Sequence, residues 1–323
     1  VPAMGCTEPI AIAYAAAKAR EVLDCTPVRA ELVVSNNIIK NVKSVVVPNT
    51  DGLKGLEAAV AAGAAAGDAS QVLQVISRVD DVGRKAIRKF LQEVPICVHP
   101  AQSDEIFDIL VELKGKTDQV RVRITSCHTN IVLIEKNGQA LFQGSPQADE
   151  SHPDGYEQLN VRDILEYAET VPLEPVAPIL ERQINYNTAI SQAGLTGRWG
   201  AAIGKTLLDM YGNDVTIRAR AAAAAGSDAR MSGCEKPVII NSGSGNQGMT
   251  ASLPVIAYAQ ELGKSHQELL RALLLSNLLT LHLKTGIGRL SAYCGAVCAG
   301  CAAGSAIAWL NGGDYQVITH TLV

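Results

Sequence analysis

The chain has 323 residues, a length that allows two domains. Its net charge of −4 is small and it contains no block of lysines and arginines, which argues against the clustered phosphate contacts of a nucleic-acid-binding protein. The longest apolar stretches are interrupted by glycine, asparagine or basic residues, so we expect no membrane span and a cytoplasmic protein. With 47% hydrophobic but only 4% aromatic residues, the core is built from small aliphatic side chains, and the Ala-rich helices permit a homo-oligomer.

Residues 1–26 are expected to form an N-terminal helix that carries the motif Gly5-Cys-Thr-Glu-Pro9. Thr7 is expected to cap this helix, with Glu8 in its first turn. Cys6 directly precedes the helix, where the positive end of the helix dipole favours a thiolate over a thiol. Cys6 is therefore a candidate for reactivity or metal ligation, and the alternative is a small buried cysteine beside a helix cap.

Residues 27–160 are expected to form an α+β domain with an antiparallel sheet. Asn137-Gly138 is the strongest hairpin signal in the chain. The polar stretch of residues 143–160 predicts a surface loop and a domain boundary. Period-2 patterns and turn residues predict strands over Val28–Ser35, Val42–Val47, Glu105–Leu113, Val120–Thr125, Ile131–Glu135 and Ala140–Phe142, and helices are predicted over Leu53–Ala66 and Asp81–Glu93.

Residues 161–323 are expected to form a mostly helical catalytic domain, because strand signals fade after the polar loop. The N-terminal helix is able to pack on either half. The predicted fold class is therefore α+β, with an N-terminal sheet-containing unit and a C-terminal helical domain. Helical periodicity covers Arg162–Thr170, Pro175–Ala193, Gly197–Tyr211, Thr216–Ala225, Thr250–Leu262, His266–Leu283 and Gly286–Leu310.

A glycine-rich stretch from Asn241 to Gly248 separates a short apolar run from a longer helix-like one. Glycine lets the backbone adopt positive φ and brings N–H groups close to a ligand. If a helix begins near Gln247, its free N–H groups and positive dipole end suit a carboxylate or phosphate. The alternative is a serine-capped turn without a ligand. The candidate substrate-binding residues here are Ser242, Gly243, Ser244, Gly245, Asn246 and Gln247.

Two further segments carry side chains suited to substrate binding. Ser126-Cys-His-Thr-Asn130 follows a predicted strand and offers a titratable imidazole, a hydroxyl and an amide. Arg230 lies just ahead of the glycine-rich stretch, and its planar guanidinium is able to bind a carboxylate in a bidentate manner. The alternatives are structural: a histidine at a strand end, and a surface ion pair of Arg230 with Asp228.

Eight cysteines in a chain of this length favour buried thiols, metal ligands or nucleophiles over a disulfide framework. Cys294, Cys298 and Cys301 have the spacing of the radical S-adenosylmethionine motif, but that motif lies on an early loop of a β/α barrel. Here the segment is late, Ala/Gly-rich and helical. Positions i, i+4 and i+7 share one helix face, so a packing stripe is favoured, and a single member remains available as a metal ligand.

The glycine-rich stretch is also similar to the cofactor-binding segment of cysteine-synthase-like pyridoxal-phosphate enzymes. Those enzymes need an upstream lysine for a Schiff base, set between a strand and a helix. Lys205 and Lys236 are the nearest candidates, and neither has that setting. The alternating strand–helix pattern is also absent from the second half of the chain, which makes this the weaker interpretation.

Five segments, taken together and in this order, resemble the L-cysteine desulfidase family. This is an oxygen-sensitive iron–sulfur group related to the serine dehydratase alpha chain. Each motif alone is weak, but the set is specific and covers essentially the whole chain. The segments are Gly5-Cys-Thr-Glu-Pro9, Ser126-Cys-His-Thr-Asn130, Ser227-Asp-Ala-Arg-Met231, Ser242-Gly-Ser-Gly-Asn-Gln-Gly248 and Arg289-Leu-Ser-Ala-Tyr-Cys294.

The resemblance implies a [4Fe–4S] cluster held by three cysteines, with one iron left open as a Lewis acid. Cys6 and Cys294 occupy the positions of two of these ligands. The third family cysteine lies in a Cys-Asp-Gly-Ala stretch further toward the C-terminus. This sequence contains no such stretch, so we expect the third ligand beyond residue 323.

The resemblance also implies a β-elimination on a small amino-acid substrate. L-cysteine would give pyruvate, ammonia and sulfide, and a serine-like hydroxyl would also bind iron, so the sequence leaves both substrates open. The non-enzymatic alternative is a small-molecule-binding protein that kept the pocket and lost the cluster. His128 is the candidate base, with a cluster-bound group as the alternative. The glycine-rich loop would hold the substrate carboxylate, and the further candidate substrate-binding residues are Thr7, Glu8, Thr129, Asn130 and Arg230.

Overall fold

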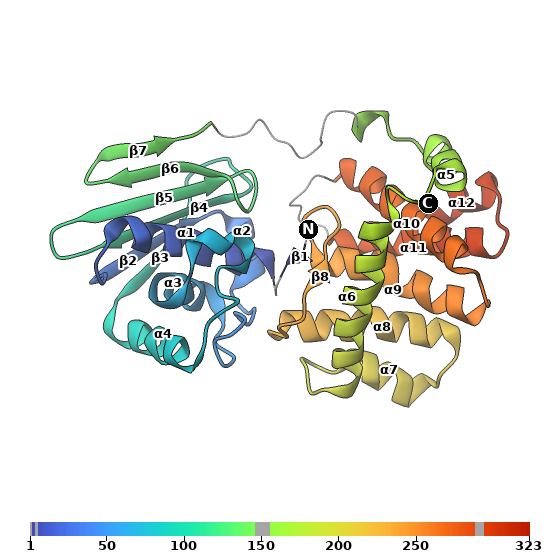
Figure 1. The fold of residues 1–323 in the computed structure, drawn as a ribbon, viewed down its shortest axis with the longest axis horizontal. Coiled ribbons are helices and arrows are strands. Elements are labelled where there is room, and N and C mark those ends of the chain that lie inside the picture. The colour runs from blue at the N-terminus through green and yellow to red at the C-terminus, as the bar shows by residue number, and fades with distance from the viewer. Residues whose placement is uncertain (1, 4–5, 146–155, 288–293) are drawn as a thin grey trace. The chain divides into compact units, whose positions relative to one another are not determined.

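The structure, a computed structural model, describes residues 2–3, 6–145, 156–287 and 294–323. The chain divides into two compact units. Met4–Glu150 form the α+β unit, whereas Val1–Ala3 and Ser151–Val323 form the helical unit (Figure 1). The predicted α+β fold class is confirmed, and the N-terminal helix belongs to the α+β unit. Within the described residues, no helix has both the length and the apolar character needed to cross a membrane.

The α+β unit is built on a six-stranded sheet with the spatial order β3-β2-β4-β5-β6-β7. The expected antiparallel sheet is in fact mixed, because β2 pairs in parallel with β3, which the sequence did not predict. The other neighbouring strands pair antiparallel. The strands are β2 (Arg29–Val34), β3 (Ile96–Pro100), β4 (Asp108–Lys114), β5 (Gln119–Thr125), β6 (Ile131–Lys136) and β7 (Gln139–Gln143).

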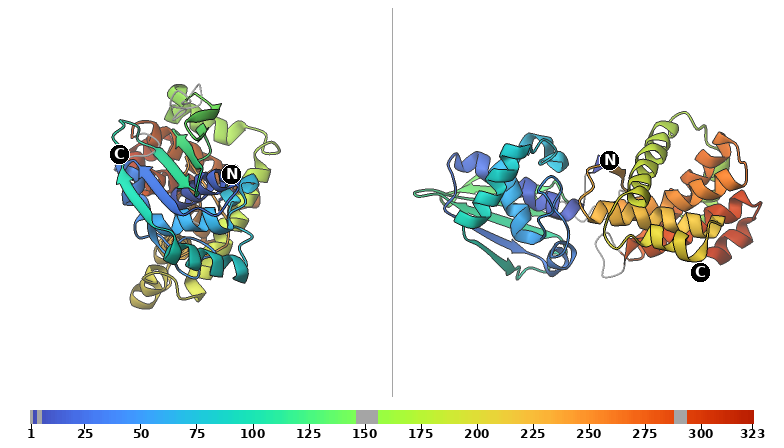
Figure 2. Two further views of the ribbon diagram at one scale, coloured as in Figure 1. Left: turned by 90° about the vertical axis from the view of Figure 1, so that its left-hand side faces the viewer. Right: turned by 90° about the horizontal axis from the view of Figure 1, so that it is seen from below.

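One face of this sheet is apolar and packs against helices, as Figures 1 and 2 show. Alternation along β2, β4 and β5 turns Leu32, Val111 and Val122 inward, and all three are fully buried. Alanine and glycine let the helices approach closely: a Cβ at Gly63 would lie 2.0 Å from the carbonyl oxygen of Ala13. The helices of this unit are α1 (Thr7–Leu23), α2 (Asn36–Val42), α3 (Gly55–Ala66), α4 (Asp81–Glu93) and the 3₁₀ helix η1 (Ala69–Gln74).

One predicted strand of this unit is wrong. Residues 42–47 were expected to continue the sheet, but α2 occupies Asn36–Val42, and only Val46 forms an isolated bridge, to Lys54. The pattern misled because Val45 and Val47 are buried core residues of the connection that follows α2 and are not members of the sheet.

The helical unit packs its helices around an aliphatic core to which α5, α6, α9, α10, α11 and α12 contribute buried residues. Its short strand β8 (Val238–Ile239) pairs antiparallel with β1 (Pro2–Ala3), so the first residues of the chain belong to this unit. The helices are α5 (Val161–Thr170), α6 (Ala177–Thr196), α7 (Ile203–Tyr211), α8 (Val215–Met231), α9 (Gly245–Glu261), α10 (His266–Thr285), α11 (Gly295–Leu310), α12 (Tyr315–Leu322) and the 3₁₀ helix η2 (Tyr156–Gln158).

Candidate active site

The glycine-rich stretch forms a tight turn that leads directly into α9. Asn241 and Ser244 exchange two backbone hydrogen bonds, of 3.1 and 3.0 Å, around Ser242 and Gly243. These two residues have positive φ, 45° and 79°, as the turn requires. The Ser244 hydroxyl accepts a hydrogen bond from the Gln247 N–H, so α9 begins at Gly245, two residues before the expected start.

The other two glycines of the stretch serve close approach rather than positive φ. A Cβ at Gly248 would lie 2.1 Å from the carbonyl oxygen of Ile239 in β8. A Cβ at Gly245 would lie 2.4 Å from Nε of Arg230. The first turn of α9 therefore touches the backbone of β8 on one side and a guanidinium on the other. At this end of the helix, the Gly245 and Asn246 N–H groups have no intrahelical acceptor.

Arg230 is the buried cation of this site. It belongs to the last turn of α8 and is only 3% exposed. Its Nη1 donates to Oδ1 of Asn246 (3.1 Å) and contacts the sulfur of Met231, while its Nε has no hydrogen-bond partner. No carboxylate of the described residues pairs with it. Asp228, the alternative partner, instead accepts a hydrogen bond from the Ile203 N–H (2.7 Å).

A network of buried amides fixes the turn from behind. Gln247 donates to Asn241 (3.0 Å), and Asn241 donates to Asn277 of α10 (2.9 Å). Asn277 and Gln183 of α6 exchange two hydrogen bonds, of 2.8 and 3.1 Å. Asn187, one turn further along α6, accepts from the Ile239 N–H (2.9 Å). Buried amides of this kind hold a single geometry because each lost bond leaves an unsatisfied group.

The N-terminus of α11 lies against the same loop. Cys294 is the exposed N-cap residue of α11, and no side-chain hydrogen bond caps the helix. A Cβ on the next residue, Gly295, would lie 1.9 Å from Oε1 of Gln247 and 3.5 Å from Nζ of Lys284. Oε1 of Gln247 is buried and has no partner. Cys294 is thus adjacent to the glycine-rich loop in the helical unit.

Lys284 was missed by the sequence analysis. It ends the long apolar helix α10, where a lysine is usually read as a favourable partner of the helix dipole. In the structure it is only 5% exposed. Burial lowers its pKa, and the nearby thiols of Cys298 and Cys294 oppose this change. The available signal was its position: after Arg271, Lys284 is the next lysine, arginine, aspartate or glutamate in this helix.

The other two cysteines of the spaced set behave as packing residues. Cys298 is buried and Cys301 is half-buried on α11, as the packing-stripe interpretation predicts. Burial raises the pKa of the Cys298 thiol, which disfavours a thiolate there. Residues 289–293 of the last family motif lie outside the described residues.

The second set of candidate residues lies in the α+β unit, at the start of α1. Cys6, not Thr7, is the N-cap residue, and no side chain caps the helix, so that prediction is wrong. Both residues are buried. Glu8 is in the first turn as expected, and its carboxylate accepts hydrogen bonds from Cys6 Sγ (2.8 Å), Thr7 Oγ1 (3.3 Å) and Asn41 Nδ2 (3.3 Å). This carboxylate is therefore already engaged within its own unit.

The segment Ser126–Asn130 lies at the same end of the sheet as the start of α1. Lys136, at the end of β6, donates to the Val22 carbonyl near the end of α1 (3.2 Å). The connection that precedes β6 therefore lies toward the other end of this helix. His128 is buried there and packs edge-on against Phe107, with 4.7 Å between ring centroids.

Thr129 and Asn130 complete this segment. Asn130 folds back on Thr125, to whose carbonyl its side chain donates (3.3 Å), whereas Thr129 is exposed. Two sequence motifs more than a hundred residues apart thus lie toward the same end of the α+β unit.

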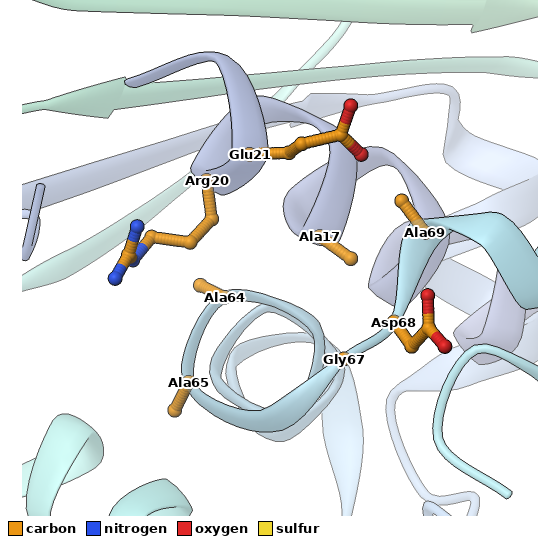
Figure 3. Close-up of a pocket in the computed structure, with 8 residues that line it drawn as sticks. All are labelled: Ala17, Arg20, Glu21, Ala64, Ala65, Gly67, Asp68 and Ala69. Carbon is orange, nitrogen blue, oxygen red and sulfur yellow. The ribbon is translucent and has the colours of Figure 1, made fainter. Parts of the chain in front are cut away.

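One described hollow lies near the end of α1, away from these residues. It has a volume of about 420 Å³ and is lined by small residues, four alanines and a glycine, together with Arg20, Glu21 and Asp68 (Figure 3). A 17-residue helix is about 25 Å long, so this hollow lies far from Cys6. The Asp68 carboxylate is engaged by Ser70. Neither the lining nor the position favours this hollow as the active site.

Comparison with known proteins decides the family. Residues 70–323 match the family model of the serine dehydratase alpha chain. The chain belongs to this family. The match includes the glycine-rich loop, Arg230, His128 and Cys294, whereas the motif around Cys6 lies before it.

Several UPF0597 proteins are similar to this chain over its whole length. A UPF0597 protein of Desulfitobacterium hafniense is 58% identical over the whole chain, which covers 75% of that relative. UPF0597 proteins of Lachnoclostridium phytofermentans and Finegoldia magna are 49% and 47% identical, also over the whole chain, which covers 78% and 77% of them. No solved structure matches the chain.

The described residues were also tested for a metal site. Among them, no three side chains of His, Cys, Asp or Glu converge as metal ligands. Singly, Cys294 fits the ligand role expected of it, because it is exposed at an uncapped helix N-terminus near a cation. A complete three-cysteine set is not assembled by the described residues.

Proposed function

We propose that this family member catalyses β-elimination of L-cysteine to pyruvate, ammonia and sulfide. Membership in the serine dehydratase alpha chain family supports a lyase at the level of reaction class. The observation that carries the proposal is Arg230, a buried guanidinium without a carboxylate partner at the start of α9. Buried charges are normally paired, so this one favours an anionic ligand.

The substrate carboxylate would bind at the first turn of α9. There the Arg230 guanidinium meets the two free N–H groups of Gly245 and Asn246, and the dipole of a 17-residue helix adds to the attraction. Asn246 orients the guanidinium through its 3.1 Å hydrogen bond. Ser242, Gly243 and the amide network behind them hold the turn in a fixed geometry before the substrate arrives.

Cys6 and Cys294 would supply two of the ligands of a [4Fe–4S] cluster. When bound, the cluster supplies a Lewis-acidic iron that withdraws charge from the substrate's β-substituent. In this proposal Glu8, which accepts the Cys6 S–H in the described structure, takes up the proton that ligation releases. Thr7 completes this polar end of α1.

His128 is proposed as the base that removes the α-proton, with Thr129 and Asn130 as neighbouring polar contacts. Imidazole is suited to this task because its pKa lies near neutrality. The aminoacrylate that elimination leaves is hydrolysed by water to pyruvate and ammonia.

L-serine is the second candidate substrate, and the family model, that of the serine dehydratase alpha chain, favours it. A pyridoxal-phosphate enzyme receives less support, since its candidate Schiff-base lysines, Lys205 and Lys236, are both exposed. A pocket that only binds a small molecule would use the same Arg230 site without turnover.

The test is anaerobic reconstitution of the full-length protein with iron and sulfide, followed by assays of pyruvate on both amino acids and of sulfide on L-cysteine. We expect turnover of L-cysteine, and loss of both cluster and activity in Cys6→Ser. Turnover of L-serine alone would select the dehydratase. Turnover of neither amino acid, with the cluster present, would reject the proposal, and cofactor absorption without iron would favour pyridoxal phosphate.

A further inference from the structure

The second buried cation of the helical unit, Lys284, has no role in the account above. It is 5% exposed at the end of α10, and its ammonium forms no hydrogen bond or ion pair within the described residues. The segment that connects α10 to α11, residues 286–294, contains no acidic residue. The helix dipole favours a lysine at a helix C-terminus only weakly, which does not explain why this side chain is only 5% exposed.

The ammonium of Lys284 lies close to the N-terminus of α11. Nζ lies 3.5 Å from the position that a Cβ of Gly295 would occupy, at the first residue of α11. The α11 N-terminus has no side-chain cap and no acidic residue in its first turn. The unpartnered Oε1 of Gln247 lies at the same position. Lys284, an uncapped helix N-terminus and Cys294 therefore meet in one polar spot beside the glycine-rich loop.

We propose that Lys284 is a catalytic residue that binds the departing β-substituent of the substrate as an anion at the first turn of α11. This inference rests on the proposed function, in which the cluster withdraws charge from the β-substituent. It adds a second, electrostatic stabilisation of the same departing group, which the Arg230 site does not supply. Arg230 would hold the carboxylate on one side of the first turn of α9. Lys284 would act beside Gln247, two residues further along that turn.

The chemical step balances without a further reactant. A base takes the α-proton, the Cα–H electron pair forms the new C=C bond, and the Cβ–S bond breaks with its electron pair leaving on sulfur. The product is hydrosulfide, whose negative charge develops beside the Lys284 ammonium. The ammonium keeps its proton, so its contribution is electrostatic and is present in advance of the reaction.

The role predicts a dependence on the leaving group. Chloride departs readily without assistance, whereas thiolate departs poorly, so the two substrates to compare are β-chloro-L-alanine and L-cysteine. Lys284→Met keeps the apolar stem and removes the charge. We expect it to lower kcat/KM about 100-fold for L-cysteine and less than about fivefold for β-chloro-L-alanine. Lys284→Arg should retain most of the activity, which also excludes a Schiff-base lysine.

The matched control is Arg220→Met, an exposed cation of α8 in the same unit, which should leave both rates unchanged. A structural role of Lys284 would lower both rates equally, and equal losses would overturn the proposal. If the wild-type protein turns over neither substrate, the proposed function fails rather than this inference.

A second measurement tests the inference independently of turnover. Crystals of the full-length protein are soaked in sodium bromide, and the anion is located by anomalous scattering. We expect bromide within hydrogen-bond distance of Nζ in the wild type and its absence from that place in Lys284→Met. No bromide at Lys284 in the wild type would overturn the inference, and so would bromide that persists there in Lys284→Met.

Discussion

The two units differ in whether their buried charged side chains have an oppositely charged partner. In the α+β unit, the buried carboxylate of Asp108 accepts two hydrogen bonds from Arg123, both of 2.9 Å, and a third from Ser103 (2.6 Å). The hydrogen bonding of Arg123 to the Asp108 carboxylate raises the pKa of Arg123. In the helical unit, Arg230 and Lys284 are buried without a carboxylate partner among the described residues.

The difference separates charges that serve the fold from charges that await a ligand. A paired buried charge repays part of its desolvation through its partner, whereas an unpaired one lowers stability until something binds. Such a cost is retained where function requires it. The comparison therefore supports our proposal that the substrate carboxylate binds in the helical unit, around the first turn of α9.

The largest effect is expected from removing the unpaired guanidinium. Arg230→Met should lower kcat/KM about 100- to 1,000-fold, because the substrate carboxylate loses a charge-assisted partner. The same change should leave the urea midpoint of the ligand-free protein unchanged or higher, since it removes an uncompensated buried charge.

The control for this variant is Arg220→Met, an exposed arginine on the same helix, which should change neither quantity. If Arg230→Met instead lowered stability by several kcal/mol and left the rate intact, Arg230 would belong with Asp108 as a structural charge.

The opposite pattern is expected in the α+β unit. Asp108→Asn should destabilise the protein by about 1–3 kcal/mol, less than for a fully buried pair because Arg123 is one-third exposed. Amino-acid binding at Arg230 should be unaffected. Urea unfolding measures the loss of stability, and titration calorimetry measures amino-acid binding. If Asp108→Asn lost binding without losing stability, Asp108 would not be a structural charge, and the difference between the two units would not hold.

A smaller effect is expected at the contact that holds Cys294 against the loop. Gly295→Ala places a methyl group against Oε1 of the buried Gln247 and should cost about 1–3 kcal/mol. Gly300→Ala, on the same helix but with no atom within 4 Å of the added carbon, should be neutral or stabilising.

Thermal unfolding and the iron content of the reconstituted protein measure this effect. The double change Gly295→Ala with Gln247→Ala should recover part of the loss, because the clashing oxygen is gone. Equal unfolding temperatures and iron contents of Gly295→Ala and Gly300→Ala would show that the space beside Gln247 admits a methyl group at residue 295.

The smallest effect is expected from an exposed, satisfied charge in the helical unit. Hydrogen bonds from Ser265 lower the pKa of Glu268 in the capping box of α10. Because the folded pKa lies below the unfolded one, the stabilisation is present at neutral pH and is lost as the pH falls through the carboxyl range. Ser265→Ala removes the hydroxyl that caps the Glu268 N–H and also donates to the Glu268 carboxylate. It should therefore lower the urea midpoint slightly at pH 7 and by less at low pH, where only the cap is lost. The same deficit at both pH values would contradict this.

Local patterns predicted most elements, because their signals act over a few residues. The Asn137-Gly138 hairpin and helix α4 follow directly from turn chemistry and periodicity. The strand predicted over residues 42–47 failed because buried valines in a connection, Val45 and Val47, alternate in the same way as residues of a strand. β3 was missed because its parallel partner β2 is distant in sequence and nothing local marks the pairing.

The site was predictable where a motif names a residue and not where tertiary packing creates the chemistry. The glycine-rich loop and Arg230 carried recognisable patterns, although two of the glycines serve close packing rather than backbone conformation. Lys284 and the amides of Gln183 and Asn277 carried none. Their roles arise only when α6, α9 and α10 bring them together.

The most direct test of the unpaired-charge account is the affinity of the full-length protein for L-alanine, which has the carboxylate but no β-leaving group. Titration calorimetry should show binding to the wild type and about 100-fold weaker binding to Arg230→Met. Equal affinity in the two proteins would show that the buried guanidinium does not bind the substrate carboxylate.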